Sequence, residues 1–227
     1  MRLKIIHDVE GFAQLASQWN SLLHRSYSDR VFSTYEWQHT WWTTYLPGDL
    51  LIIVAYDDAD QLIAIAPWFI EPRADERVLR SIGCVDVTDY VDLIIDREHI
   101  APVCEQLAQQ LAKHHALFDR INLCNIPQES PTLTVFVDAL KANQFAVQAE
   151  FQEVCPIIHL PETFEAYVES LDKKNRHELR RKLRRSSSDD EMVAWYIAGD
   201  DHDLEAALTT FMSLMAASQP AKAEFLS

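Results

Sequence analysis

From residue 50 to residue 70 the chain reads LLIIVAYDDADQLIAIAPWFI. Two apolar runs, Leu50–Tyr56 and Leu62–Ile70, are separated by an aspartate-rich segment, and such residues favour turns. The pattern predicts an antiparallel hairpin with long arms. Because Pro67 has no backbone N–H to donate, we expect the pairing to weaken late in the second arm.

On the N-terminal side of this hairpin, the pattern predicts a short strand at residues 2–6 and a helix from about Val9 to His24. A second helix is expected to start at Ser33, because Ser33-x-x-Glu36 has the spacing of a capping box. Its side chains at i+4 spacing, which should pack in the core, are Trp37, Trp41 and Tyr45. Trp42 lies off this stripe and is expected at a cleft or at an interface.

On the C-terminal side, further short apolar runs predict strands and two more helices. The expected strands are Val78–Ile82, Val91–Ile95, Arg120–Cys124, Phe145–Phe151 and Val154–Leu160. One helix should run from an N-cap at Asp96 to about His114, and Ser130-Pro131 should open the other. The order predicts a mixed α/β (α+β) domain over residues 1–160, with one sheet covered by helices on both faces.

A new pattern begins at Pro161. A short amphipathic helix and a basic helix are expected over residues 161–190, followed by a strand at Met192–Ile197 and a helix from Asp203 to about Ala217. One strand cannot form a sheet by itself. Either these elements dock onto the first domain, or residues 191–227 are the start of a second domain that is cut short. We expect the second arrangement, with residues 161–190 as a helical junction.

Charge is distributed unevenly along the chain. The net charge is −15, which disfavours general nucleic-acid binding and argues against DNA as a partner. Residues 173–185 nevertheless hold eight Lys or Arg and one acid, Glu178. This segment predicts either a solvated junction helix or an element that contacts anions such as phosphates.

Other motifs exclude several classes of protein. The N-terminus lacks the apolar core of a signal peptide, and the longest uncharged stretch, residues 61–70, is too short to span a membrane. The histidines show no metal-binding spacing, so no metal site is predicted. Because the four cysteines are scattered without a CxxC pair, each is expected to be a small buried residue in a cytoplasmic protein.

Several of these segments, taken in order, resemble the FemAB/CelD-type GNAT-like acyltransferases. The shared features are Trp19, the segment Phe32-Ser33-Thr34-x-x-Trp37-x-x-x-Trp41, Gly83 followed by Asp89-Tyr90-x-Asp92, and the basic helix that begins at Leu171. The resemblance covers nearly the whole chain. It implies a GNAT-like mixed sheet flanked by helices, followed by an incomplete second GNAT-like unit.

The resemblance also implies an activity. Such proteins transfer an acyl group from acyl-CoA to the amine of a small molecule or glycan, in polysaccharide or cell-envelope biosynthesis. An alternative within the family is transfer of an amino acid from tRNA to a peptidoglycan bridge, and a non-catalytic binding module is a third possibility. Because much of the working cleft would belong to the second unit, the chain by itself is expected to be nearly inactive.

Two groups of residues are candidates for the site. Asp89, Tyr90 and Asp92 form a polar cluster in which a carboxylate would accept the proton of an attacking amine and a tyrosine would protonate the leaving thiolate. The alternative is a polar loop with Tyr90 packed inward. The candidates for contact with donor phosphates are Lys173, Lys174, Arg176, Arg180 and Arg181. Arg80–Val85 matches only the first half of a GNAT pyrophosphate turn.

Overall fold

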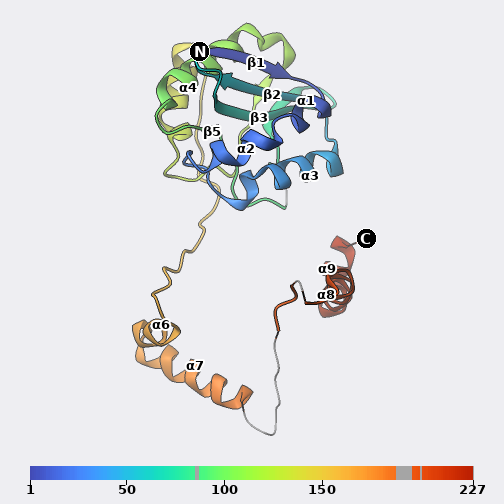
Figure 1. Cartoon of the computed structure of the whole chain (residues 1–227), viewed down its shortest axis with the longest axis vertical. Helices are drawn as coiled ribbons and strands as arrows, with labels where there is room; N and C mark the ends of the chain where they lie inside the picture. Colours follow the sequence, from blue (N-terminus) through green and yellow to red (C-terminus); the bar gives the residue numbers. More distant parts are fainter. Residues whose placement is uncertain (85–86, 188–195, 200, 227) are drawn as a thin grey trace. The chain divides into compact units, whose positions relative to one another are not determined.

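The structure, a computed structural model, describes residues 1–84, 87–187, 196–199 and 201–226. The chain divides into two compact units, Met1–Val154 and Cys155–Ser227, each described by itself (Figure 1). None of the described helices is both long enough and apolar enough to cross a membrane.

The first unit is built on one mixed sheet. Its strands lie in the order β1 (Arg2–Ile6), β2 (Asp49–Tyr56), β3 (Leu62–Pro72), β4 (Arg77–Ser81) and β6 (Arg120–Ile121), while β5 (Ile94–Ile95) pairs with β3. All pairings are antiparallel except that of β4 with β6, which is parallel. The predicted hairpin is confirmed as β2 and β3, and Pro67 sits within the ladder opposite Ile52.

Helices of the first unit are α1 (Val9–Ala13), α2 (Ala16–Leu23), α3 (Tyr35–Tyr45), α4 (Ile100–Lys113) and α5 (Val135–Ala142). Short 3-10 turns occur at Val31–Ser33, His115–Leu117 and Pro131–Leu133. The second unit contains α6 (Phe164–Ser170), α7 (Lys173–Ser186), α8 (Leu204–Ser218) and α9 (Pro220–Phe225).

The sheet is buried on both faces. Leu50, Ile52 and Val54 of β2 pack in one cluster with buried side chains of α1, α2 and α3. Their neighbours at odd positions, such as Leu51 and Ile53, pack in a second cluster with α4 and α5. Each such side chain contributes roughly 1.5–3 kcal/mol to folding. The prediction of a mixed α/β unit is confirmed, and the sheet is mostly antiparallel and flanked by helices (Figure 1).

Helix boundaries near the N-terminus differ from the predictions. The expected helix at residues 9–24 is two helices, α1 and α2, because Leu15 N donates to Phe12 O in an i to i−3 bond at the junction. Thr34, not Ser33, caps α3: its hydroxyl accepts from Trp37 N, whereas Ser33 belongs to the preceding 3-10 turn.

The buried face of α3 is also rotated from the prediction. It consists of Gln38, Trp41 and Trp42, while Tyr45 is 51% exposed. The i+4 aromatic stripe therefore describes the core-facing side only in part, because Trp41 and Trp42 both pack against Phe69 of β3. Gln38 is buried, and its Nε2 donates hydrogen bonds to Phe32 O and Ile82 O.

Two predicted helix starts also shift. Asp96 was expected to cap a helix directly, but α4 begins at Ile100 after His99. The Asp96 carboxylate instead accepts from Arg25 Nε at 2.7 Å and so joins the end of α2 to the start of α4. Ser130 does act as a cap, for the 3-10 turn at Pro131–Leu133 that precedes α5.

The expected strands Phe145–Phe151 and Val154–Leu160 are wrong. Neither segment pairs with the sheet, and Phe151 and Ile157 are 79% and 74% exposed. The last strand of the sheet, β6, spans two residues and offers a short edge to pair with. Of the expected strand Met192–Ile197, residues 192–195 lie outside the described residues, and Tyr196 and Ile197 are not in a strand.

Candidate functional site

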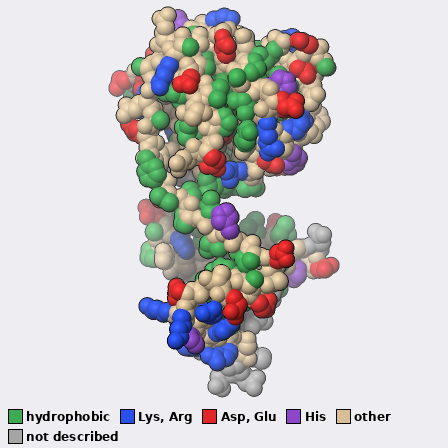
Figure 2. Space-filling view, turned by 90° about the vertical axis from the view of Figure 1, so that its left-hand side faces the viewer, with side chains coloured by type: hydrophobic (Ala, Val, Ile, Leu, Met, Phe, Trp, Pro, Cys, Tyr) green, Lys and Arg blue, Asp and Glu red, His purple; other side chains and the backbone are tan. Residues whose placement is uncertain are grey.

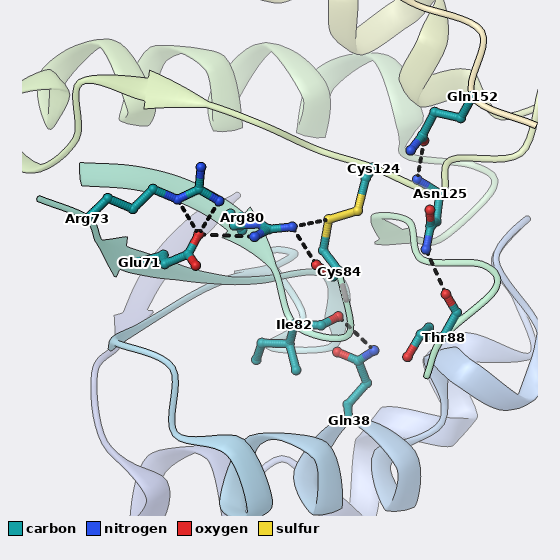
Figure 3. Close-up of a disulfide and its surroundings, with 10 residues drawn as sticks. All are labelled: Gln38, Glu71, Arg73, Arg80, Ile82, Cys84, Thr88, Cys124, Asn125 and Gln152. Atoms are coloured by element: carbon teal, nitrogen blue, oxygen red, sulfur yellow. Dashed lines mark hydrogen bonds and ion pairs between the residues drawn. A yellow bond between two sulfur atoms is a disulfide. The ribbon is translucent and has the colours of Figure 1, made fainter. Parts of the chain in front are cut away.

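The carboxyl ends of β4 and β6 lie side by side, because these strands are parallel neighbours with Leu79 opposite Ile121. In open, mostly parallel α/β sheets, ligands bind outside the carboxyl ends of the strands, and the parallel pair of β4 and β6 is the comparable place in this sheet. The segments that follow the two strands are joined by a disulfide between Cys84 and Cys124, whose Cα atoms are 5.9 Å apart (Figure 3). This edge carries the loop that contains Asp89 and Tyr90.

The disulfide corrects the expectation that each cysteine is a separate buried residue. Cys84 is fully buried but bonded to Cys124, Cys104 is buried and free, and Cys155 is exposed and free. The two bonded residues are 40 positions apart. Spacing along the chain therefore gave no signal for the pair.

Arg80–Val85 begins with a tight turn at the end of β4. Gly83 has φ of +91°, and Cys84 N donates to Ser81 O at 3.0 Å. A Cβ at Gly83 would lie 3.0 Å from Val91 Cγ1, so both the backbone and the space favour glycine. Among the described residues that follow, the first helix begins only at Ile100. The turn therefore does not lead directly into the helix N-terminus that a pyrophosphate loop uses.

Asn125, in the segment after β6, forms hydrogen bonds with the same loop. Its side-chain Nδ2 donates to Thr88 O at 2.6 Å, and its backbone O accepts from Val91 N at 3.2 Å. Gln152 Oε1 in turn accepts from Asn125 N at 2.7 Å (Figure 3). The two bonds of Asn125 fall on either side of Asp89 and Tyr90, and so define where this short segment lies.

The three predicted residues of the polar cluster occupy different environments. Asp89 is exposed. Tyr90 is half-buried, with the Arg30 guanidinium 4.8 Å from its ring centroid and the Phe32 ring 6.3 Å away. Asp92 is buried, with 9% of its surface exposed. The structure therefore places Asp89 and Tyr90 at the surface of the loop and Asp92 beneath it.

Asp92 is held by hydrogen bonds from neighbouring segments. Its Oδ1 accepts from Thr132 Oγ1 at 2.5 Å and from Leu93 N at 2.8 Å. Burial raises the pKa of Asp92, although hydrogen bonds from Ser130 and Thr132 oppose this effect. The bonds tie the end of the loop to the turn before α5.

A small cavity lies beside Asp92. Its volume is about 10 Å³, enough for roughly one water molecule. Cys104 lines the cavity, and burial, together with the nearby Asp92 charge, raises the pKa of its thiol to about 12. A group of this kind stays protonated at neutral pH and is a poor nucleophile.

Arg80, the first residue of the segment compared with a pyrophosphate turn, contacts the disulfide. Its Nη2 donates to Cys84 O at 2.6 Å and lies 3.6 Å from Cys84 Sγ, while Nη1 donates to Glu71 Oε2 at 3.0 Å (Figure 3). Burial would raise the pKa of Glu71, but the guanidinium groups of Arg80 and Arg73 outweigh it and hold the pKa below its usual value. Arg80 itself is largely enclosed, with 13% of its side chain exposed.

The candidate phosphate-binding residues lie on α7, which begins where the Asp172 carboxylate accepts from Lys174 N at 2.9 Å. Arg176 and Arg180 form ion pairs with Glu169 of α6 at 3.5 and 2.7 Å, and Arg181 pairs with Glu178 at 2.7 Å. Lys173 and Lys174 are exposed near the start of the helix. Figure 2 shows Lys and Arg side chains close together on the second unit, which contains α7.

An open groove of about 450 Å³ lies elsewhere on the first unit. Its lining residues are His7, Asp8, Val9, Trp42, Leu46, Gly48, Asp49, Leu50, Leu51, Ile70 and Leu117. Trp42 is among the lining residues, but it is 3% exposed and packs in the core against Phe69, so the expectation that it lies off the core-facing side is wrong. No group of three or more His, Cys, Asp or Glu in the described part of the chain is arranged to hold a metal ion.

Comparison with known proteins gives structural matches alone, since no family model and no curated protein matches the sequence. One similar structure is described as a probable acetyltransferase, with 16% identity, a TM-score of 0.42, and coverage of 71% of this chain and 100% of the other. Another is glucosamine-6-phosphate N-acetyltransferase from Arabidopsis thaliana, with 12% identity, a TM-score of 0.42, and coverage of 68% and 99%.

A third is an aminoglycoside antibiotic 6'-N-acetyltransferase from Acinetobacter baumannii, with 15% identity, a TM-score of 0.40, and coverage of 70% and 100%. At these scores the matches assign no activity to this chain.

Proposed function

We propose that the chain belongs to a GNAT-like N-acyltransferase of the FemAB/CelD type, which transfers an acyl group from acyl-CoA to the amine of a small molecule or glycan. The observation that carries this proposal is the meeting of the carboxyl ends of β4 and β6 at the loop that holds Asp89 and Tyr90. The ordered sequence resemblance supports the same activity. The reaction would take place in the cytoplasm, in polysaccharide or cell-envelope biosynthesis.

The proposed chemistry is direct attack of the amine on the thioester carbonyl. Asp89 accepts a proton from the amine, and the Tyr90 hydroxyl donates a proton to the thiolate of CoA as it leaves. Asp92 is a positioning residue, because its carboxylate bonds to Thr132 and Leu93 instead of facing the surface. As a separate proposal for the second unit, the candidates for contact with donor phosphates are Lys173, Lys174, Arg176, Arg180 and Arg181.

The test is release of CoA from acyl-CoA with a panel of amines, together with acyl-CoA binding by calorimetry. Asp89→Asn and Tyr90→Phe should lower the rate about 100-fold, the lower range for general acid or base catalysis. Asp138→Asn and Tyr45→Phe, which alter exposed residues elsewhere, are the matched controls. Because the chain by itself is expected to be nearly inactive, absence of acyl-CoA binding would overturn the proposal, whereas a low rate of CoA release would not.

A second candidate function is transfer of an amino acid from aminoacyl-tRNA, favoured by the density of cations on α7. Five phosphate contacts predict that the logarithm of the binding constant falls with that of the salt concentration, at a slope of roughly −3.5 to −4.5. Binding of tRNA with such a slope, made less steep by roughly 1.4 to 1.8 in a Lys173→Gln, Lys174→Gln double variant, would favour this function over acyl-CoA transfer.

A further inference from the structure

The two sulfur-bearing residues of the disulfide differ in accessibility. Cys84 is 0% exposed, enclosed by the turn at the end of β4. Cys124 is half-buried, in the segment after β6. A thiolate from solution attacks the sulfur that it can reach, and Cys124 is the residue of the pair that has exposed surface.

The two residues also differ in their electrostatic surroundings. The guanidinium of Arg80 lies 3.6 Å from Cys84 Sγ and is oriented by Glu71 and by the Cys84 carbonyl (Figure 3). A neighbouring guanidinium stabilises a thiolate relative to a thiol, and a more stable thiolate leaves faster in disulfide exchange. Arg80 therefore favours Cys84 as the leaving group, against the opposing effect of burial, which disfavours a thiolate.

We propose that Cys84–Cys124 is a thiol–disulfide exchange site for a small monothiol, with Cys124 as the sulfur attacked and Cys84 as the leaving thiolate. In the first step the monothiol thiolate forms a bond to Cys124 Sγ, the Cys84–Cys124 bond breaks, and its electron pair goes to Cys84. In the second step another monothiol thiolate attacks the mixed disulfide, releasing the oxidised dimer of the monothiol and the Cys124 thiolate. Two monothiols are oxidised and the protein disulfide is reduced; the released thiolates take protons from water.

Exchange has a defined structural consequence. The disulfide and the two hydrogen bonds of Asn125 hold the loop after β4 against the segment after β6. Breaking the disulfide removes the covalent link nearest the Gly83 turn, while the Asn125 bonds to Thr88 and Val91 remain. The exchange would thus loosen one end of the loop without unfolding the sheet. This inference does not depend on the proposed acyltransferase activity.

The test is mass mapping of the mixed disulfide that forms with glutathione. A Cys155→Ser background removes the exposed free thiol, and Cys104, buried and with its pKa raised, serves as an internal unreactive control. The folded, oxidised protein should acquire glutathione on Cys124 and not on Cys84. In single variants, the free Cys124 of Cys84→Ser should react with a disulfide reagent at least tenfold faster than the free Cys84 of Cys124→Ser.

The contribution of Arg80 is tested separately. Arg80→Gln should slow formation of the mixed disulfide about threefold, the change expected when rate follows about half of a one-unit pKa change. Arg80→Lys keeps the charge and should restore most of the rate, which a merely structural role of Arg80 would not predict. Circular dichroism confirms that each variant is folded.

Three results would overturn the inference. They are absence of the disulfide in the air-oxidised protein, a folded disulfide that resists millimolar glutathione, and a first adduct on Cys84. Hydrogen exchange of the Thr88 and Asp89 amides provides a second readout, because reduction should increase it while amides of β2 and β3 stay protected.

Discussion

Replacing the buried carboxyl of Asp92 tests how the loop end is held in place. Asp92→Ala leaves two buried donors, the Thr132 hydroxyl and the Leu93 amide, without their acceptor. Each unpaired donor costs about 1–3 kcal/mol, so the variant should lose roughly 2–6 kcal/mol of unfolding free energy. Asp92→Asn retains an oxygen that accepts both bonds, and at neutral pH its stability should fall within about 1 kcal/mol of the native protein.

The same pair of proteins predicts a pH dependence. Burial raises the pKa of Asp92 above its ordinary value of 3.8, so the folded state binds this proton more tightly than the unfolded state. The stabilisation from protonated Asp92 is complete below the unfolded pKa and is lost as pH rises through the folded pKa. Asp92→Asn has no such proton. The difference in unfolding free energy, native minus Asp92→Asn, should therefore fall as pH rises from about 4.

Urea unfolding at several pH values, followed by tryptophan fluorescence, measures these differences. The probe suits the site because the core of the first unit contains Trp19, Trp41, Trp42 and Trp68. The reasoning fails if Asp92→Ala unfolds within 0.5 kcal/mol of the native protein, a margin typical of a surface substitution. It also fails if Asp92→Asn is as damaging as Asp92→Ala, since both would then act by a route other than unpaired donors.

Three further predictions concern other parts of the chain. Gly48→Ala should destabilise the first unit by about 1–3 kcal/mol and lower its melting temperature, because the added Cβ would meet Ile70 O and force a backbone shift. In the control Gly199→Ala the added Cβ meets nothing within 4 Å, so the melting temperature should be unchanged. Trp19→Phe should lower the free energy of unfolding by about 1–2 kcal/mol more than Trp68→Phe, measured by urea unfolding. The reason is that Trp19 Nε1 donates to Ser33 O at 2.8 Å, whereas Trp68 Nε1 has no hydrogen-bond partner to leave unpaired. Equal losses in the two variants would contradict this. Asp172→Ala should speed hydrogen exchange at the Lys174 and Asn175 amides, which its carboxylate caps, while Asp203→Ala, which removes the cap of α8, leaves them unchanged.

The sequence was informative where structure depends on neighbours along the chain. The hairpin of β2 and β3 was predicted because its two apolar runs and the turn between them are adjacent. The helix expected from Asp203 to about Ala217 was predicted for the same reason, and it is α8. It failed where partners are distant. Alternating apolar residues at 145–151 are compatible with an extended chain, but they do not reveal whether a sheet edge is available to pair with.

The features of the candidate site were also predicted only where they depend on neighbours along the chain. The polar residues around Tyr90 are recognisable in the sequence, but the burial of Asp92 depends on Thr132, 40 residues away. Likewise, Cys84 meets Cys124 only because β4 and β6 are parallel neighbours, and the contact of Arg80 with this pair follows from the turn at Gly83. Knowledge of that one strand pairing would have brought the cysteines together; residue spacing could not.

Burial of β2 on both faces has a consequence for how the hairpin finds its alignment. In a sheet with one wet face, sliding a strand by one residue exposes its apolar side chains and is strongly penalised. Here every residue from Leu50 to Ala55 is apolar, so a shift by one residue would still place apolar side chains on both faces of the strand. Alignment must then be set at the ends: by the Asp57 carboxylate, which accepts from the Ala59 and Gln61 amides, and by Gly48, where a side chain would strike the opposite strand. These two short segments therefore fix the register of the hairpin, which the apolar side chains between them do not specify.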